Sequence, residues 1–551
     1  MSLNSWKFLN HLREIFQKFV LDKQELTQII NKIHQIQDLN DYISFTKTKI
    51  SSVHHSVQKG CLSVLKSTTP IINREAQKIQ INDKDLSSWK TVKRISQSQH
   101  LLVKPKELLE SINAAKNEED LLVNVEALIL HLKEHPETRN NAIQHGAIRI
   151  ILNKRLTITS EVVKGALREA LAILGYSDPV SGRGIRILSI DGGGIRGVLV
   201  LEMLKKLEEL TGKRVYEIFD FFCGVSTGAI LTYSMGLSLF LIKYIWLRHI
   251  KCVAGVHLRK LEDIIMRYEA LSQEIFNQSR IFGTSKLVWS HAYYDTALWE
   301  KKLKEYLGNE NLISTSRGPL CPKICVVSAI VNQSQLSAYT FRNYALPWRF
   351  QSEYEGTFNA QVWEAARASA AAPTFFEEFR INDLIHQDGG ILVNNPTAIA
   401  IHEAKLLWPG VPIQCVVSFG TGRSVPSSVE LAKLKALKKK VSLESGSEGT
   451  SWSNKFFKIL DSATDTQAVH IMLSDLLPET VYYRFNPYLT EVIGMVETDL
   501  EKQKQMKRDT LMYLRRNEDK FQEAGKTLML GKTLGQRIGE KIKFQRELLG
   551  I

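Results

Sequence analysis

The chain has 551 residues, too many for a single small domain, and its 44% apolar content excludes a disordered protein. A formal net charge of +14 favours an anionic partner. No nucleic-acid-binding motif accompanies this charge, so we expect a membrane surface with anionic lipids and no nucleic acid. The six cysteines form no C-x-x-C pair, which predicts reduced thiols inside the cell.

Two regions precede the first predicted strand. Residues 1–104 are polar and basic, and Trp6, Leu9, Leu12 and Phe16 recur at helical spacing among lysines. This pattern fits a targeting or membrane helix and a plain amphipathic core helix equally well. Residues 105–180 predict a helical, armadillo-like cap on the catalytic domain. Its expected helices are 105–115, 118–135, 137–153 and 160–174.

The first strand–turn–helix unit carries a glycine run. A strand at Ile187–Ile190 precedes Asp191, Gly192, Gly193, Gly194 and Arg196, and an amphipathic helix follows. Successive N–H groups of a glycine-rich turn at a helix N-terminus form a cradle for negative charge. We therefore predict an oxyanion hole at Gly192, Gly193 and Gly194, with Arg196 positioning the loop or holding a phosphate.

The same glycines satisfy a second pattern, because Gly192-x-Gly194-x-x-Gly197 has the spacing of a dinucleotide-binding loop. A dinucleotide-binding site would have an acidic residue at the end of the next strand. In this sequence the next strand ends in a G-x-S-x-G turn instead. We favour the oxyanion hole and keep nucleotide binding as an alternative.

The second unit has a serine in its turn. The apolar strand 218–223 precedes Gly224-Val225-Ser226-Thr227-Gly228, and G-x-S-x-G between strand and helix is typical of a nucleophile elbow. We predict Ser226 as the nucleophile, with Gly224 and Gly228 allowing the tight turn.

The 22 uncharged residues between Asp220 and Lys243 have the length of a membrane span, but a buried strand and helix explain them. Leu237–Ala254 has the character of an insertion.

An alternation of strands and helices follows and predicts an α/β layered sheet. The expected strands are 324–331, 338–341 and 415–419, and the expected helices are 357–370 and 397–407.

Asp388-Gly-Gly lies between these two helices, and its glycines allow another segment of backbone to approach closely. Asp388 is the candidate base, and burial would have to raise its proton affinity; an ordinary Asp-Gly turn is the alternative. Residues 424–551 predict a basic loop, with a Lys-rich helix at 431–441, and a helical C-terminal extension.

These motifs resemble the patatin-like phospholipase family and, within it, the calcium-independent phospholipase A2 gamma group. The resemblance rests on Asp191-Gly-Gly-Gly-Ile-Arg196-Gly, Gly224-x-Ser226-x-Gly228 and Asp388-Gly-Gly in this order, and extends over roughly residues 110–550. It implies a three-layer α/β sandwich with a catalytic domain at 185–423. It also implies a Ser226–Asp388 dyad without histidine, oxyanion N–H groups from Gly193 and Gly194, and hydrolysis of glycerophospholipid acyl esters without metal or cofactor. By resemblance we expect an intracellular, membrane-associated enzyme (mitochondrion, endoplasmic reticulum or peroxisome). The sequence leaves open whether it is a monomer or a homo-oligomer.

Two further hypotheses remain open. An ordinary Ser-His-Asp esterase would recruit His402 or His470, which follow Asp388 in the chain order of that class. A catalytically silent membrane-binding scaffold would result if the insertion at Leu237–Ala254 disabled the neighbouring nucleophile helix.

Overall fold

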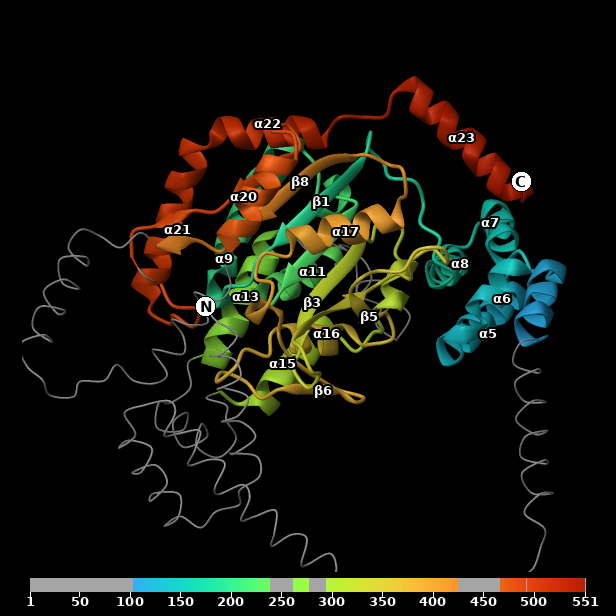
Figure 1. Cartoon of the computed structure of the whole chain (residues 1–551), viewed down its shortest axis with the longest axis horizontal. Coiled ribbons are helices and arrows are strands. Elements are labelled where there is room, and N and C mark those ends of the chain that lie inside the picture. Colours follow the sequence, from blue (N-terminus) through green and yellow to red (C-terminus); the bar gives the residue numbers. More distant parts are fainter. Residues whose placement is uncertain (1–102, 238–260, 277–293, 425–465, 492, 551) are drawn as a thin grey trace, which may run out of the picture. The chain divides into compact units, whose positions relative to one another are not determined.

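The computed structural model describes residues 103–237, 261–276, 294–424, 466–491 and 493–550 (Figure 1). They belong to the second of two compact units, Gln97–Ile551, and the first unit is Met1–Ser96. Three predictions lie outside the described residues: the N-terminal targeting helix, the insertion after Leu237 and the Lys-rich helix at 431–441.

A nine-stranded sheet is the centre of the described part of the chain, with the order β10-β8-β1-β2-β3-β4-β5 and with β6 and β7 off this path. The strands are β1 (Ile185–Ile190), β2 (Phe221–Val225), β3 (Lys323–Ile330), β4 (Ser337–Arg342), β5 (Glu355–Thr357), β6 (Phe379–Ile381), β7 (Leu384–Asp388), β8 (Ile413–Phe419) and β10 (Tyr482–Phe485). The strands from β10 to β3 run parallel, whereas β4 and β7 run antiparallel to β3. Because β10 follows residue 423, the sheet extends beyond the predicted segment 185–423.

Helices cover both faces of this sheet, which makes three layers (Figure 1). Leu188 and Phe222 pack with one set of helices: α9 (Gly197–Thr211), α11 (Thr227–Gly236), α13 (Leu261–Phe276), α16 (Val362–Ser369) and α22 (Glu518–Leu528). Ile187 and Phe221 pack on the opposite face with α17 (Thr397–Leu407) and α20 (Thr466–Leu476). Since side chains alternate along a strand, a parallel strand covered on both faces must be apolar throughout. The predicted α/β fold class is confirmed.

The N-terminal region is helical, as predicted, and has its own hydrophobic core. A helix at 103–114 precedes α5 (Glu118–Glu134), α6 (Arg139–Gln144), α7 (Ala147–Thr157) and α8 (Glu161–Ile173). The expected single helix 137–153 is wrong, because Gly146 has φ +79° and interrupts it. Glu169 of α8, fully buried, forms ion pairs with Lys133 and Arg317, which joins this region to the short helix η3 (Ile313–Arg317).

Two other sequence predictions need correction. The expected helix 357–370 begins only at Val362, because Thr357 is in β5 and a capping box of Gln361 and Glu364 starts α16. The expected strand 218–223 is displaced to β2 (Phe221–Val225), and its first residue, Ile218, is the last residue of the short helix α10 (Val215–Ile218).

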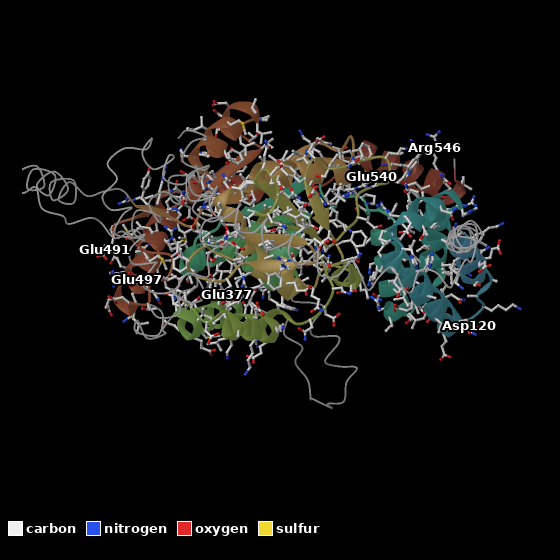
Figure 2. All side chains as sticks on the ribbon, turned by 60° about the horizontal axis from the view of Figure 1, so that its bottom comes forward. Asp120, Glu377, Glu491, Glu497, Glu540 and Arg546 are labelled. Carbon is white, nitrogen blue, oxygen red and sulfur yellow. The ribbon has the colours of Figure 1, made fainter. Side chains whose placement is uncertain are left out.

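The C-terminal extension is helical, as expected, and comprises α21 (Leu500–Arg516), α22 and α23 (Leu534–Leu549). Figure 2 labels Glu540 and Arg546 on α23. It also labels Glu491 and Glu497, which bracket the segment that carries Met495. Within the described ranges, no helix is both long enough and apolar enough to span a bilayer.

Candidate active site

One edge of β3 brings Ser226 and Asp388 together. Val225, the last residue of β2, pairs with Val327, and Asp388, the last residue of β7, pairs with Ser328. Because β4 pairs along the other edge of β3, the strands β2 and β7 share one edge and meet end to end. The residue after β2 and the last residue of β7 therefore become neighbours, although 162 positions separate them in the sequence.

Ser226 occupies a strained turn between β2 and α11. Its φ of 54° and ψ of −121° are rarely adopted by residues other than glycine. A Cβ on Gly228 would lie 2.3 Å from the carbonyl oxygen of Ile190, and one on Gly224 would lie 2.3 Å from that of Gly228. Both predicted glycines are therefore required by close packing of the turn.

A neighbouring serine fixes the backbone of this turn. The N–H of Ser226 donates to Ser369 Oγ at 2.9 Å, and Ser369 Oγ donates to the carbonyl oxygen of Val327 at 2.6 Å. Ser369 thus links the elbow to β3. No local sequence pattern marks Ser369 for this role, because its position next to Ser226 depends on α16 packing over β3.

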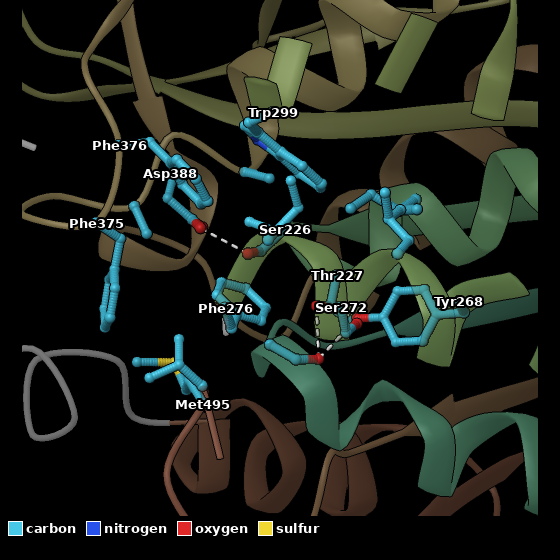
Figure 3. Close-up of a pocket in the computed structure, with 17 residues that line it drawn as sticks. Ser226, Thr227, Tyr268, Ser272, Phe276, Trp299, Phe375, Phe376, Asp388 and Met495 are labelled. Atoms are coloured by element: carbon cyan, nitrogen blue, oxygen red, sulfur yellow. Dashed lines mark hydrogen bonds between the residues drawn. The ribbon is translucent and has the colours of Figure 1, made fainter. Parts of the chain in front are cut away.

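The Ser226 hydroxyl donates to Asp388 Oδ2 at 2.6 Å (Figure 3). The other carboxylate oxygen, Oδ1, accepts the N–H of Gly390 at 2.8 Å. Burial raises the pKa of Asp388 from 3.8 to about 6, although the hydrogen bonds from Ser226 and Gly390 act to lower it. The carboxylate is therefore ionised near neutral pH and binds a proton more tightly than an exposed aspartate. This is the property that a general base needs.

The glycine loop lies beside Ser226 in the wall of the same site. The N–H of Gly192 donates to Asn394 Oδ1 at 3.1 Å, so this predicted oxyanion donor already has an acceptor. The N–H groups of Gly193 and Gly194 have no acceptor among the described residues. Arg196 Nε donates to the carbonyl oxygen of Gly193 at 3.3 Å, which holds the loop from within.

Several contacts that the sequence analysis did not assign hold this loop in place. Thr421 Oγ1 donates to the carbonyl oxygen of Gly192 at 2.7 Å. Thr227 Oγ1 and Tyr268 OH each donate to the carbonyl oxygen of Gly194 at 2.8 Å. With the loop carbonyls held by these donors, the N–H groups of Gly193 and Gly194 have a fixed direction.

An apolar pocket extends from the dyad. Its lining includes the side chains Ile230, Leu271, Phe276, Trp299, Phe375 and Phe376 (Figure 3). Ser226 and Asp388 form its polar end. The lining has the apolar character that an aliphatic chain requires.

The histidines of the alternative triad lie elsewhere. His402 Nε2 accepts the N–H of Glu353 at 3.4 Å, and His470 Nδ1 lies 3.3 Å from Tyr482 OH. No histidine of the described residues lines either pocket that contains Ser226. In the same residues, no group of three or more His, Cys, Asp or Glu side chains has an arrangement suited to a metal ion.

Comparison with known proteins places these features in a family context. Residues 188–401 match the family described as "Patatin-like phospholipase". "Calcium-independent phospholipase A2-gamma" from Homo sapiens and from Oryctolagus cuniculus are each 41% identical over 442 residues, covering 80% of this chain and 52% of the relative. "Phospholipase A I" from Arabidopsis thaliana is 31% identical and covers 71% of this chain and 32% of that protein. The chain thus spans about half the length of the gamma relatives.

A solved structure, "Human GIVD cytosolic phospholipase A2", gives a TM-score of 0.33 at 10% identity, covering 73% of this chain and 64% of that one.

Proposed function

Because residues 188–401 belong to the patatin-like phospholipase family, we propose that this chain is a calcium-independent lipid acyl hydrolase that cleaves fatty acyl esters of glycerophospholipids. The observation that carries the proposal is the 2.6 Å contact between Ser226 Oγ and Asp388 Oδ2 at the polar end of an apolar pocket. The relatives' names supply the phospholipid class and the calcium independence.

The proposed reaction begins with proton transfer from Ser226 Oγ to Asp388 Oδ2 as the oxygen attacks the acyl carbonyl carbon. Negative charge then develops on the former carbonyl oxygen, and the N–H groups of Gly193 and Gly194 donate to it. The tetrahedral intermediate collapses, the protonated Asp388 gives its proton to the departing lysophospholipid oxygen, and an acyl-Ser226 ester remains.

Hydrolysis of the acyl-enzyme repeats these steps with water. Asp388 takes a proton from the water as its oxygen attacks the acyl carbon, and then returns the proton to Ser226 Oγ. The products are a free fatty acid and the starting enzyme. In this scheme Asp388 performs all four proton transfers without an intervening imidazole, which its pKa of about 6 permits near neutral pH.

The partner in this proposal is a phospholipid membrane surface inside the cell. The net charge of +14 favours anionic lipids, because each exposed Lys or Arg near such a surface contributes about 1 kcal/mol. An enzyme of this kind would act in lipid breakdown and membrane remodelling.

The test measures fatty-acid release from phospholipid vesicles in excess chelator for the wild type, Ser226→Ala and Asp388→Ala. Exposed Ser334→Ala and Asp383→Ala serve as matched controls. We expect release by the wild type and both controls and none by the two site variants. Vesicle binding without release by any protein would favour the silent scaffold, and restoration of release by deletion of Leu237–Ala254 would attribute the silence to the insertion.

A further inference from the structure

A second hollow in the described part of the chain lies among β9 (Arg423–Ser424), β11 (Tyr488–Leu489), α20, α21 and the first turn of α22. It shares no lining residue with the two pockets that contain Ser226. Its lining is strongly basic. The basic side chains are Arg423, His470, Arg484, Arg516 and Lys520, and the lining contains one acidic side chain, Asp509.

Much of this positive charge is not neutralised within the described ranges. Arg484 forms an ion pair with the buried Asp191, with Nη1 at 2.8 Å from Oδ1. Asp509 accepts the N–H and the hydroxyl of Thr490, at 2.8 and 2.9 Å. In contrast, the structure records no ion pair in these ranges for three of the cations, Arg423, Arg516 and Lys520.

Two of these cations are held in position. Lys520 Nζ donates to the carbonyl oxygen of Arg484 at 2.8 Å. The Arg423 guanidinium stacks over the Tyr488 ring, 3.9 Å from its centroid. Fixed donors lose little conformational freedom when a ligand binds, so a preformed cluster of this kind favours binding.

The electrostatic environment of His470 supports the same picture. Burial lowers the pKa of His470, and Arg484, Lys520 and Arg423 lower it further. Several positive charges therefore act on one point of the hollow. An anion bound there would relieve their mutual repulsion.

We propose that this hollow is a binding site for a phosphate monoester, separate from the acyl pocket. A phosphate monoester carries a charge of about −1.5 to −2 and three acceptor oxygens, which suits a cluster of several cations better than a singly charged carboxylate does. The guanidinium groups of Arg423 and Arg516 offer the paired N–H donors that match phosphate oxygens. The position is also one where α/β sheets bind ligands, because Arg423 and Asn486 follow the carboxyl ends of the parallel strands β8 and β10.

The phosphate monoester has two sources, a membrane lipid headgroup or a small soluble compound, and the test separates them. Full-length protein is titrated calorimetrically with inorganic phosphate and with glycerol 3-phosphate. In parallel it is sedimented with vesicles of ether-linked phosphatidylcholine that contain ether-linked phosphatidic acid, or ether-linked phosphatidylglycerol at equal surface charge. Ether-linked lipids offer no acyl ester, so the result does not depend on the proposed hydrolase activity.

The variants are Arg423→Gln and Arg516→Gln, whose side chains are exposed, and the control is Arg515→Gln, an exposed neighbour on α21 outside the hollow. We expect saturable binding, about tenfold weaker in each variant of the hollow and unchanged in the control. Binding of glycerol 3-phosphate identifies a soluble ligand, and binding of phosphatidic acid vesicles alone identifies a headgroup. The proposal is overturned by an absence of saturable binding in every arm, by equal losses in Arg515→Gln and Arg516→Gln, or by equal binding of phosphatidylglycerol and phosphatidic acid.

Discussion

The substitution Asp388→Asn separates two consequences of the buried carboxylate, its capacity to accept a proton and its effect on stability. Burial raises the pKa of Asp388 from 3.8 to about 6. The folded protein therefore binds this proton more tightly than the unfolded chain does. As the pH rises from below 3.8 to above about 6, the contribution of Asp388 to the free energy of unfolding falls, by about 3 kcal/mol in total.

An asparagine keeps the shape of the side chain and carries no charge. Its amide oxygen can accept the N–H of Gly390, and its amide nitrogen can donate to Ser226 Oγ. We therefore expect the stability of Asp388→Asn relative to wild type to increase by about 2 kcal/mol between about pH 4 and about pH 7.5. At about pH 7.5, fatty-acid release by Asp388→Asn should be about a thousandfold slower than release by the wild type, because the base is lost.

Urea unfolding followed by tryptophan fluorescence at the two pH values measures the stability difference. Asp383→Asn, on the exposed turn between β6 and β7, is the matched control and should show neither effect. In the wild type, kcat/KM should fall about tenfold per pH unit below about pH 6. A stability difference that does not change with pH, together with a flat rate profile, would refute the assignment of Asp388 as a desolvated base.

Three other substitutions test neighbouring contacts. Ser369→Ala leaves the N–H of Ser226 without its acceptor, so kcat should fall and the melting temperature should drop, consistent with a loss of about 1–3 kcal/mol; unchanged kcat would contradict a positioning role. The double variant His402→Ala with His470→Ala should release fatty acid at the wild-type rate, and a loss of about a hundredfold or more would favour the Ser-His-Asp alternative. Tyr268→Phe removes one donor to the glycine loop, so kcat/KM should fall several-fold, by about 1 kcal/mol, with no change in vesicle binding.

Local sequence patterns predicted much of the fold, because they depend on short-range geometry. The helix 397–407 is observed with the predicted bounds, since its apolar residues recur at helical spacing and Pro396 precedes it. The sequence patterns did not predict the strand β10. Its four residues, Tyr-Tyr-Arg-Phe, include an arginine, a residue type that is usually exposed. In the structure Arg484 is buried, and Asp191, distant in sequence, neutralises it. A strand of this kind is recognisable only once its partner is known.

The candidate site divides in the same way. Ser226 and Asp388 could be selected from the turns that carry them, since a G-x-S-x-G elbow and an Asp-Gly-Gly loop are local features. Their contact could not be predicted from spacing, because it depends on β2 and β7 meeting on one edge of β3. The roles of Asn394 and Thr421 could not be predicted from the sequence either, because only tertiary packing brings each of them to the glycine loop.

The glycine run shows why a motif alone leaves two functions open. A Cβ on Gly193 would lie 2.1 Å from Thr421 Oγ1, and one on Gly194 would lie 2.0 Å from the carbonyl oxygen of Met495. Packing alone therefore requires both glycines, whether the loop binds a nucleotide or an oxyanion, and the spacing cannot distinguish the two. The neighbouring residues distinguish the two functions. Asn394 Oδ1 accepts the N–H of Gly192, and Ser226 lies beside the loop in the same pocket. The space that remains beside the N–H groups of Gly193 and Gly194 adjoins a nucleophile, which favours acyl transfer over dinucleotide binding.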